Sequence, residues 1–213
     1  MHTHFAINPT TVNPVDINLL RRHLNVYYDY EDDLIGQYAN TATSVIETNL
    51  NRFIIQKQVL WVVTRDNQND YDWNRVYQNY FSGGFYNKFI ELPHEAISID
   101  SVGFGQWSAN AIVLTNSVDY QYDVNGYPAR IKIINSMSTY DTISDFQCLY
   151  TSGIASNAIM LPQIAPELQQ AIIMMTGNLW RNRGDVEQEL WTRAIDNLCG
   201  KWKLEFYGGK SSL

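Results

Sequence analysis

The sequence predicts an α+β fold in which two helices, an antiparallel β unit and two further helices follow one another. Apolar residues recur at spacings of three and four over residues 13–53 and again over 165–199, the period of an amphipathic helix. Between these regions lie short runs of β-branched and aromatic residues, several of them alternating with polar residues as in half-buried strands. Neither helical pair can bury its apolar face alone, so we expect a discontinuous four-helix core with an inserted antiparallel β unit.

The composition excludes several classes of protein. In 213 residues, 45% are hydrophobic, enough for a sizeable core, yet no run approaches the 18 apolar residues of a membrane span. The first residues lack the basic and apolar regions of a signal peptide, so we expect none. Cys148 and Cys199 are too few and too far apart for a disulfide framework or a zinc site, and they fit a chain made in reducing cytoplasm.

The net charge and the aromatic content indicate which kinds of partner the chain is suited to bind. A net charge of -7 argues against a surface that binds nucleic acid tightly, because such a surface is basic. Charged residues make up 17% of the chain and aromatic residues 13%. This balance favours large surfaces buried against partners, although a tightly packed monomer has the same composition.

The first two helices have recognisable starts. Asn13 can cap the first helix, Pro14 suits its first position, and Ile17, Leu20 and Leu24 form its apolar face. His23 lies on its polar face, and we expect it in solvent or at an interface.

The second helix is expected from about residue 30 to residue 53. It begins after Asp29, which is a good N-cap, and Glu31, Asp32 and Asp33 occupy its first turn, where their charge complements the helix dipole. A metal site at these acids would need other ligands, and nothing in the sequence indicates them. Its apolar face comprises Leu34, Ile35, Tyr38, Ala42, Val45, Ile46, Leu50 and Phe53.

The β unit follows. Strands are expected at residues 58–64, 87–93, 97–104, 111–115, 119–124, 129–134 and 146–151. Asn125-Gly126 between two of them predicts a two-residue hairpin, because both positions tolerate positive φ. The polar stretch at residues 65–84 is expected to be a loop.

Two more helices complete the predicted core. The third begins at Pro166 and ends at Gly184, with Leu168, Ala171, Ile172, Met175 and Leu179 on its apolar face. The fourth runs from Val186 to about Cys199 and carries Leu190, Ala194, Ile195 and Leu198 on one side. The resulting divisions are an N-terminal helical half over 1–54, the β domain over 55–161, a C-terminal helical half over 162–200 and a C-terminal arm over 201–213.

The last segment is interpreted as an arm. In "GKWKLEFYGGKSSL", Trp202, Leu204 and Phe206 alternate with charged residues, which suits a strand laid along another surface. The alternative is that Trp202 and Phe206 fold back onto the core of the chain itself.

No catalytic motif is found. Phosphate-binding, zinc-protease, CxxC and serine-elbow patterns are absent, so we expect no enzyme, no cofactor and no metal. Asp66, Gln68, Asp70 and Asp72 weakly resemble a calcium loop that lacks the central glycine and the closing glutamate.

Four segments, in this order, resemble the head–tail connector (adaptor) proteins of tailed bacteriophages. They are "LLRRHLNV", "EDDLIGQYANTATSVIE", "IELPHEAISIDSV" and "LPQIAPELQQAIIMMTGNLWRNRGD". The resemblance spans residues 15 to 200. It implies a homo-oligomeric ring, usually twelve-fold, at the virion neck beneath the portal protein. Such a ring extends the DNA channel, lets DNA pass without specific binding, and docks stopper or tail-completion proteins.

The resemblance also implies a portal contact for the C-terminal arm, with Trp202, Leu204, Phe206 and Tyr207 as its residues. Two other classes of function remain open. One is a monomeric or dimeric binding module whose ligand site is lined by Trp61, Trp107 and the tyrosines of 120–127. The other is a metal-assisted hydrolase that uses Asp66, Asp70, Asp72 and His94.

Overall fold

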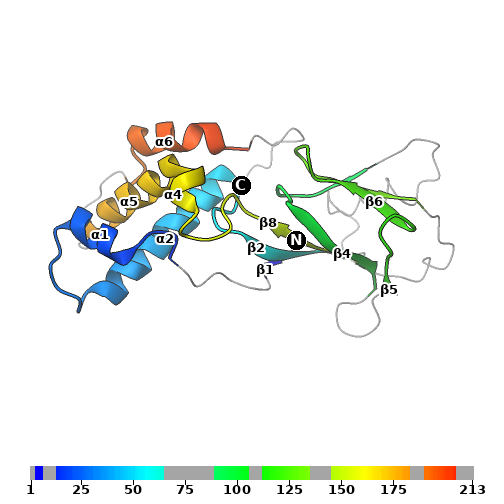
Figure 1. Cartoon of the computed structure of the whole chain (residues 1–213), viewed down its shortest axis with the longest axis horizontal. Coiled ribbons are helices and arrows are strands. Elements are labelled where there is room, and N and C mark those ends of the chain that lie inside the picture. The colour runs from blue at the N-terminus through cyan, green and yellow to red at the C-terminus, as the bar shows by residue number, and fades with distance from the viewer. Residues whose placement is uncertain are drawn as a thin grey trace. The chain divides into compact units, whose positions relative to one another are not determined.

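The chain folds into two compact units, which Figure 1 shows as a group of helices and a group of strands. The sheet unit comprises residues 1–9 and 57–152, and the helical unit comprises residues 10–56 and 153–213. The computed structural model describes residues 3–6 (backbone only), 13–64, 89–105, 112–134, 145–182 and 190–204. The α+β class predicted from the sequence is confirmed.

The first helix, α1 (Ile17–Leu24), begins one turn later than its sequence suggested. Asp16, not Asn13, is the N-cap, and its carboxylate accepts a hydrogen bond from the Asn18 N–H at 2.6 Å. Asn25 ends the helix in the left-handed conformation, where its N–H reaches the carbonyl of Arg21. Leu20 is fully buried, as its place on the apolar face predicts.

The second helix, α2 (Asp32–Leu50), is shorter at both ends than predicted. Its N-cap is Glu31, which makes no side-chain capping bond, and not Asp29. Asn51 takes the left-handed conformation and ends the helix before Phe53. The predicted start within the acidic run holds, because Asp32 and Asp33 form the first turn. The buried face comprises Ile35, Ala39, Ala42, Ile46 and Leu50.

The C-terminal helices include one that the sequence pattern did not predict. A single-turn helix, α4 (Leu161–Ile164), precedes α5 (Pro166–Arg181), in which Pro166 occupies the first position as expected. Helix α6 (Arg193–Cys199) is capped by Thr192, whose hydroxyl accepts a hydrogen bond from the Ile195 N–H. It begins later than the predicted fourth helix, whose first residues lie partly outside the described chain, and Leu190 and Ala194 are exposed.

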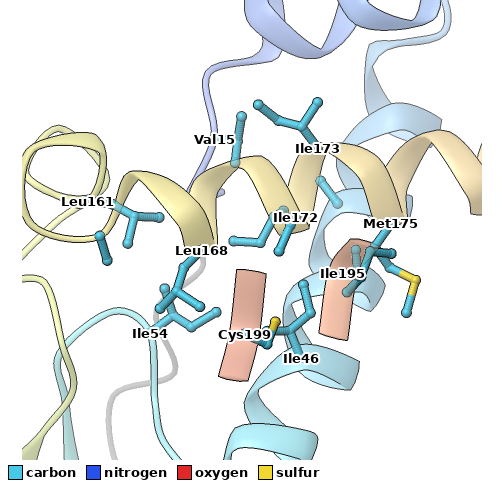
Figure 2. Close-up of a cluster of buried hydrophobic side chains, with 14 of the residues drawn as sticks. Val15, Ile46, Ile54, Leu161, Leu168, Ile172, Ile173, Met175, Ile195 and Cys199 are labelled. Carbon is cyan, nitrogen blue, oxygen red and sulfur yellow. The ribbon is translucent and has the colours of Figure 1, made fainter. Parts of the chain in front are cut away.

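Helices α2 and α5 run antiparallel and form the centre of the helical unit. At one end, Tyr38 of α2 meets Trp180 of α5 edge to face, with ring centroids 6.1 Å apart. Within the described ranges five helices, where four were predicted, contribute to one apolar cluster, part of which Figure 2 shows around α5. The labelled members of this cluster are Val15, Ile46, Ile54, Leu161, Leu168, Ile172, Ile173, Met175, Ile195 and Cys199.

The sheet unit contains two antiparallel sheets. The larger has the order β1-β2-β8-β4-β5, and the smaller has the order β3-β7-β6. The bounds of these strands are β1 (Thr3–Ala6), β2 (Lys57–Thr64), β3 (Ile90–Glu91), β4 (Ser98–Phe104), β5 (Ile112–Val113), β6 (Tyr120–Asp123), β7 (Arg130–Ile133) and β8 (Asp145–Ser152). Strand β1 was not predicted, since residues 1–54 were assigned to the helical half. It pairs with β2, with His4 opposite Trp61.

Buried and partly buried residues alternate along strand β8. Phe146, Cys148, Tyr150 and Ser152 are buried, and the residues between them are only partly buried. Phe146 contacts Trp61 of β2 and Phe104 of β4 edge to face, at centroid distances of 5.6 and 5.4 Å. Three neighbouring strands are therefore joined by one aromatic cluster.

The predicted two-residue hairpin is wrong, although β6 and β7 do form an antiparallel pair. Their last paired residues are Asp123 and Arg130, so six residues connect them, and neither Asn125 nor Gly126 has positive φ. Pro128, after a cis peptide bond, has no N–H to donate to a tight turn. Instead the Asp123 carboxylate accepts a hydrogen bond from the Asn125 N–H at 2.9 Å.

Residues 1–9 belong to the sheet unit, and after residue 10 the chain passes between the two units again at residues 56–57 and 152–153. The sequence placed these last two boundaries at 54–55 and 161–162. Residues 153–161 belong to the helical unit, where Ala155 and Leu161 are fully buried. Gly153 has a φ of +140°, and a Cβ there would lie 2.5 Å from the Gln56 Cα. Glycine is therefore required at residue 153, where the crossing at 152–153 lies against the one at 56–57.

Candidate partner-binding surfaces

The start of the predicted C-terminal arm packs on the helical unit. Residues Gly200–Trp202 form a 3₁₀ helix, η2, that continues directly from α6, and Gly200 keeps a right-handed conformation. Trp202 is half-buried and packs against the apolar cluster of the helical unit. The Leu204 N–H donates to the carbonyl of Leu50 at 3.1 Å. For residues 201–204, the extended arm is therefore replaced by the alternative in which Trp202 folds back.

Two cations and one carboxylate surround Trp202. The Arg52 guanidinium lies 5.9 Å and the Lys201 ammonium 5.0 Å from the centre of the indole ring. Arg52 also donates to the Trp202 carbonyl at 3.4 Å, and Lys201 pairs with Glu167 of α5. That hydrogen bond from Lys201 lowers the pKa of the Glu167 carboxyl. We call Arg52, Glu167, Lys201 and Trp202 the Trp202 cluster, and it attaches the C-terminal segment to α5 and to the end of α2.

The predicted portal-binding residues thus fall into two groups. Trp202 and Leu204 are held on the helical unit, and each is partly buried. Phe206 and Tyr207 lie outside the described residues.

A second surface was missed in the sequence. Residues 25–31, here called the tyrosine loop, connect α1 to α2 and carry Tyr27, Tyr28 and Tyr30, whose exposed fractions are 86%, 64% and 75%. The Tyr28 and Tyr30 rings stack with centroids 5.6 Å apart. Asp29 within the loop and Asp33 just after it are also exposed. The sequence signal is "VYYDYEDD", three tyrosines in a short polar connection before the acids of the helix start.

The tyrosine loop is held at both ends. Near its start, the Val26 N–H donates to the Arg21 carbonyl at 3.0 Å. At its far end, the Asp32 N–H donates to the Asp29 carbonyl at 3.1 Å, and the Asp32 carboxylate pairs with Arg21. The three rings are therefore presented on a backbone that is fixed on either side.

Two of the residues named for an aromatic ligand site in the β unit are buried. Trp61 is buried at 1% exposure in the centre of the large sheet, and Tyr120 is buried in the small one. Tyr122 is partly exposed and stacks on Tyr120 with centroids 6.3 Å apart. Trp107 lies outside the described residues.

Of the four residues named for the hydrolase, the structure describes His94. His94 Nδ1 lies 2.9 Å from the Tyr150 hydroxyl, and burial raises the pKa of that phenol. Asp66, Gln68, Asp70 and Asp72, which also carried the calcium hypothesis, lie outside the described residues. Within the described ranges no three His, Cys, Asp or Glu side chains are grouped so that they could hold a metal ion.

Both cysteine thiols are buried in the structure. Burial raises the pKa of Cys199 to about 11, and the pKa of Cys148, inside the sheet unit, is raised further. Such thiols are poor nucleophiles at neutral pH, because the thiolate is the reactive form.

None of the described helices is long and apolar enough to cross a membrane.

No family model and no curated protein matches the chain. Five solved chains have a similar fold, and for three of them the comparison covers 98% of both chains. These three come from the neck of an empty GTA particle computed with C6 symmetry (TM-score 0.68, 14% identity), the virion of a native gene transfer agent (GTA) particle (0.67, 14%) and the neck of a native GTA particle computed with C12 symmetry (0.67, 15%). At these identities the similarity is one of fold, and it extends over both units.

Proposed function

We propose that this chain is a structural component of the neck of a phage-like particle. The observation that carries the proposal is the fold shared with chains from GTA necks and virions over 98% of both lengths. A match that includes a discontinuous helical unit and its inserted sheet unit is more specific than a match to either unit. The resemblance of the sequence to head–tail connector proteins supports the same role, which needs no catalytic group, cofactor or metal.

Within the neck, we propose that copies form a closed ring that acts as an adaptor beneath the portal. Two of the similar chains come from neck structures with six-fold and twelve-fold symmetry. A ring of identical copies uses a head-to-tail contact between two different surfaces of the same chain. The opposite side of such a ring would receive the stopper or tail-completion protein.

The portal contact is proposed to lie in the C-terminal segment, with a division of roles. Trp202 and Leu204 fix the start of the segment on the helical unit, as their contacts indicate. Phe206, Tyr207 and the residues after them would then supply the contact with the portal. The Trp202 cluster places the beginning of this segment at a defined point beside α5.

The experiment is to produce particles with and without this chain and to image the neck. We expect heads that lack the chain to be filled but not joined to tails, and the chain supplied in trans to restore joining and to appear as a ring below the portal. Tails that join normally without the chain would contradict the proposal, as would a chain located outside the neck.

A further inference from the structure

The helical unit has two chemically different ends, separated by the length of α2. The tyrosine loop leads into the first residue of α2, and the Trp202 cluster lies at its last residues, where Leu204 bonds to Leu50. The 19 residues between them span roughly 28 Å. In Figure 1 the tyrosine loop is the blue connection between α1 and α2.

The tyrosine-loop end is aromatic and acidic. Three tyrosines are exposed by 64% or more, beside the exposed carboxylates of Asp29 and Asp33. Tyrosines are enriched at protein interfaces, where they bury a large area at a small cost in side-chain entropy. The acids disfavour a contact between two such loops, because like charges would face each other. The surface that fits this end is therefore cationic and able to accept rings.

The Trp202 end has that character. Lys201 and Lys203 are exposed there, and Arg52 and Lys201 lie against the indole ring. Within the described part of the helical unit, Arg52 and Lys201 are the only cations that lie over an aromatic ring. Lys201 also pairs with Glu167, which leaves Lys203 as the cation best placed to meet an acid from outside.

We propose that the tyrosine loop of one copy docks on the Trp202 end of the next copy and forms the contact between subunits of the ring. The inference rests on the proposed neck function, and adds the two surfaces and their pairing. The contact is head-to-tail because its two halves are different ends of one rigid helical unit, and repetition of such a contact closes a ring or extends a filament. In this contact the tyrosine rings supply the buried area. The ion pair between Asp33 of one copy and Lys203 of the next determines which two ends meet.

A charge exchange tests the pairing. Self-association of the purified full chain is measured by analytical ultracentrifugation at low and at physiological salt, for wild type, Asp33→Lys, Lys203→Glu and the double variant. Each single variant is expected to weaken association by about tenfold or more, whereas the double variant, in which every contact again pairs opposite charges, recovers most of it. Recovery requires that the two ends meet, and a loss of folding alone cannot produce it.

Neutral changes test the aromatic half. Tyr27→Ser and Tyr30→Ser are expected to weaken association with the melting temperature unchanged, because neither ring packs in the core. Tyr122→Ser on the sheet unit is the matched tyrosine control and Arg193→Glu at the start of α6 the matched charge control, and both are expected to associate as wild type.

Three results would overturn the inference. They are association within about twofold of wild type in the loop variants, no recovery in the double variant, and a wild-type chain that stays monomeric up to about 100 µM, where even a contact of micromolar affinity is populated. None of these contradicts the proposed neck function, which fails only if the chain is absent from the neck or tails join without it.

Discussion

Arg21 of α1 donates to both carboxylate oxygens of Asp32, the first residue of α2, through Nε and a terminal nitrogen of its guanidinium. The side chains keep 24% and 29% of their exposure, and the hydrogen bond to Asp32 raises the pKa of Arg21. This two-point contact joins the helices on either side of the tyrosine loop. The acidic run thus marks a helix start, as predicted, and one of its acids also sets the path of the preceding loop.

Breaking this pair should loosen the tyrosine loop more than it destabilises the core. Arg21→Gln is expected to lower the melting temperature slightly and to speed amide exchange at residues 26–32, since the fork that holds Asp32 is lost. Arg21→Lys should restore only part of the protection, because an ammonium cannot bond both oxygens in this geometry. Arg22→Gln, an exposed neighbour on the same helix, is the control. Equal exchange rates in the Arg21 and Arg22 variants would show that the pair does not order the loop.

The crossing at Gly153 should be intolerant of any side chain. Gly153→Ala places a Cβ 2.5 Å from Cα and 2.6 Å from N of Gln56 at a φ of +140°. We expect it to lower the free energy of unfolding by more than about 2 kcal/mol. Gly126→Ala, where a Cβ meets nothing within 4 Å, should change it by less than about 0.5 kcal/mol. Urea unfolding of both variants checks the contrast, and similar stabilities would refute the steric argument.

The C-terminal segment should contain a stabilising part and a dispensable part. Trp202→Ala is expected to cost about 2 kcal/mol, below the range for a fully buried tryptophan because this one is half-buried. A chain that ends at Leu204 should unfold as wild type does, while a chain that ends at Gly200 should lose at least as much as Trp202→Ala. Chemical unfolding distinguishes these. If removal of residues 205–213 alone destabilises the chain as strongly, the division at Leu204 is wrong.

The free energy of unfolding should fall in alkaline solution. The thiol of Cys199 titrates near 9.0 when free and at about 11 in the folded chain, so between these values the unfolded state binds fewer protons than the folded state. The free energy of unfolding therefore decreases as pH rises from about 9 to 11. Cys148 and Tyr150, whose pKa values burial also raises, act in the same direction. Cys199→Ala should reduce the slope over this range, and an unchanged slope would remove Cys199 as a contributor.

The chain should not bind free duplex DNA at physiological salt. Its net charge of -7 opposes tight binding to phosphates, and in the proposed ring weak contacts would let DNA move through. Fluorescence anisotropy with a short labelled duplex measures this. Sub-micromolar binding that weakens with salt would contradict it.

The fold class and the main helices could be predicted because their apolar periods are long and unambiguous. Errors arose where two nearby residues offered the same chemistry. Asn13 and Asp16 can both cap, and only backbone geometry selects Asp16. At the β6–β7 connection, the Asn125-Gly126 signal is overridden by Pro128 two residues later, which lacks the N–H that a tight ladder needs.

The candidate surfaces were harder to predict than the fold. Trp202 lies in a short segment whose sequence is compatible both with an extended arm and with a segment folded back on the core. The contacts with Arg52 and Leu50 decide between the two, and these residues are distant in the sequence. Tyrosine is amphipathic, so its presence in residues 25–31 did not reveal whether the rings were buried or exposed. Exposure is a property of the packed unit, and the pattern alone could not supply it.

The crossings of the chain at residues 56–57 and 152–153 make most of the sheet unit one continuous insertion. Because Gln56 and Gly153 are neighbours in space, everything between them is inserted at a single point of the helical unit. Recombination or slippage within residues 57–152 can therefore lengthen, shorten or replace every strand of the sheet unit except β1, while every helix keeps its own neighbours. A lineage of such proteins can thus exchange most of its sheet while it inherits the helical unit almost intact.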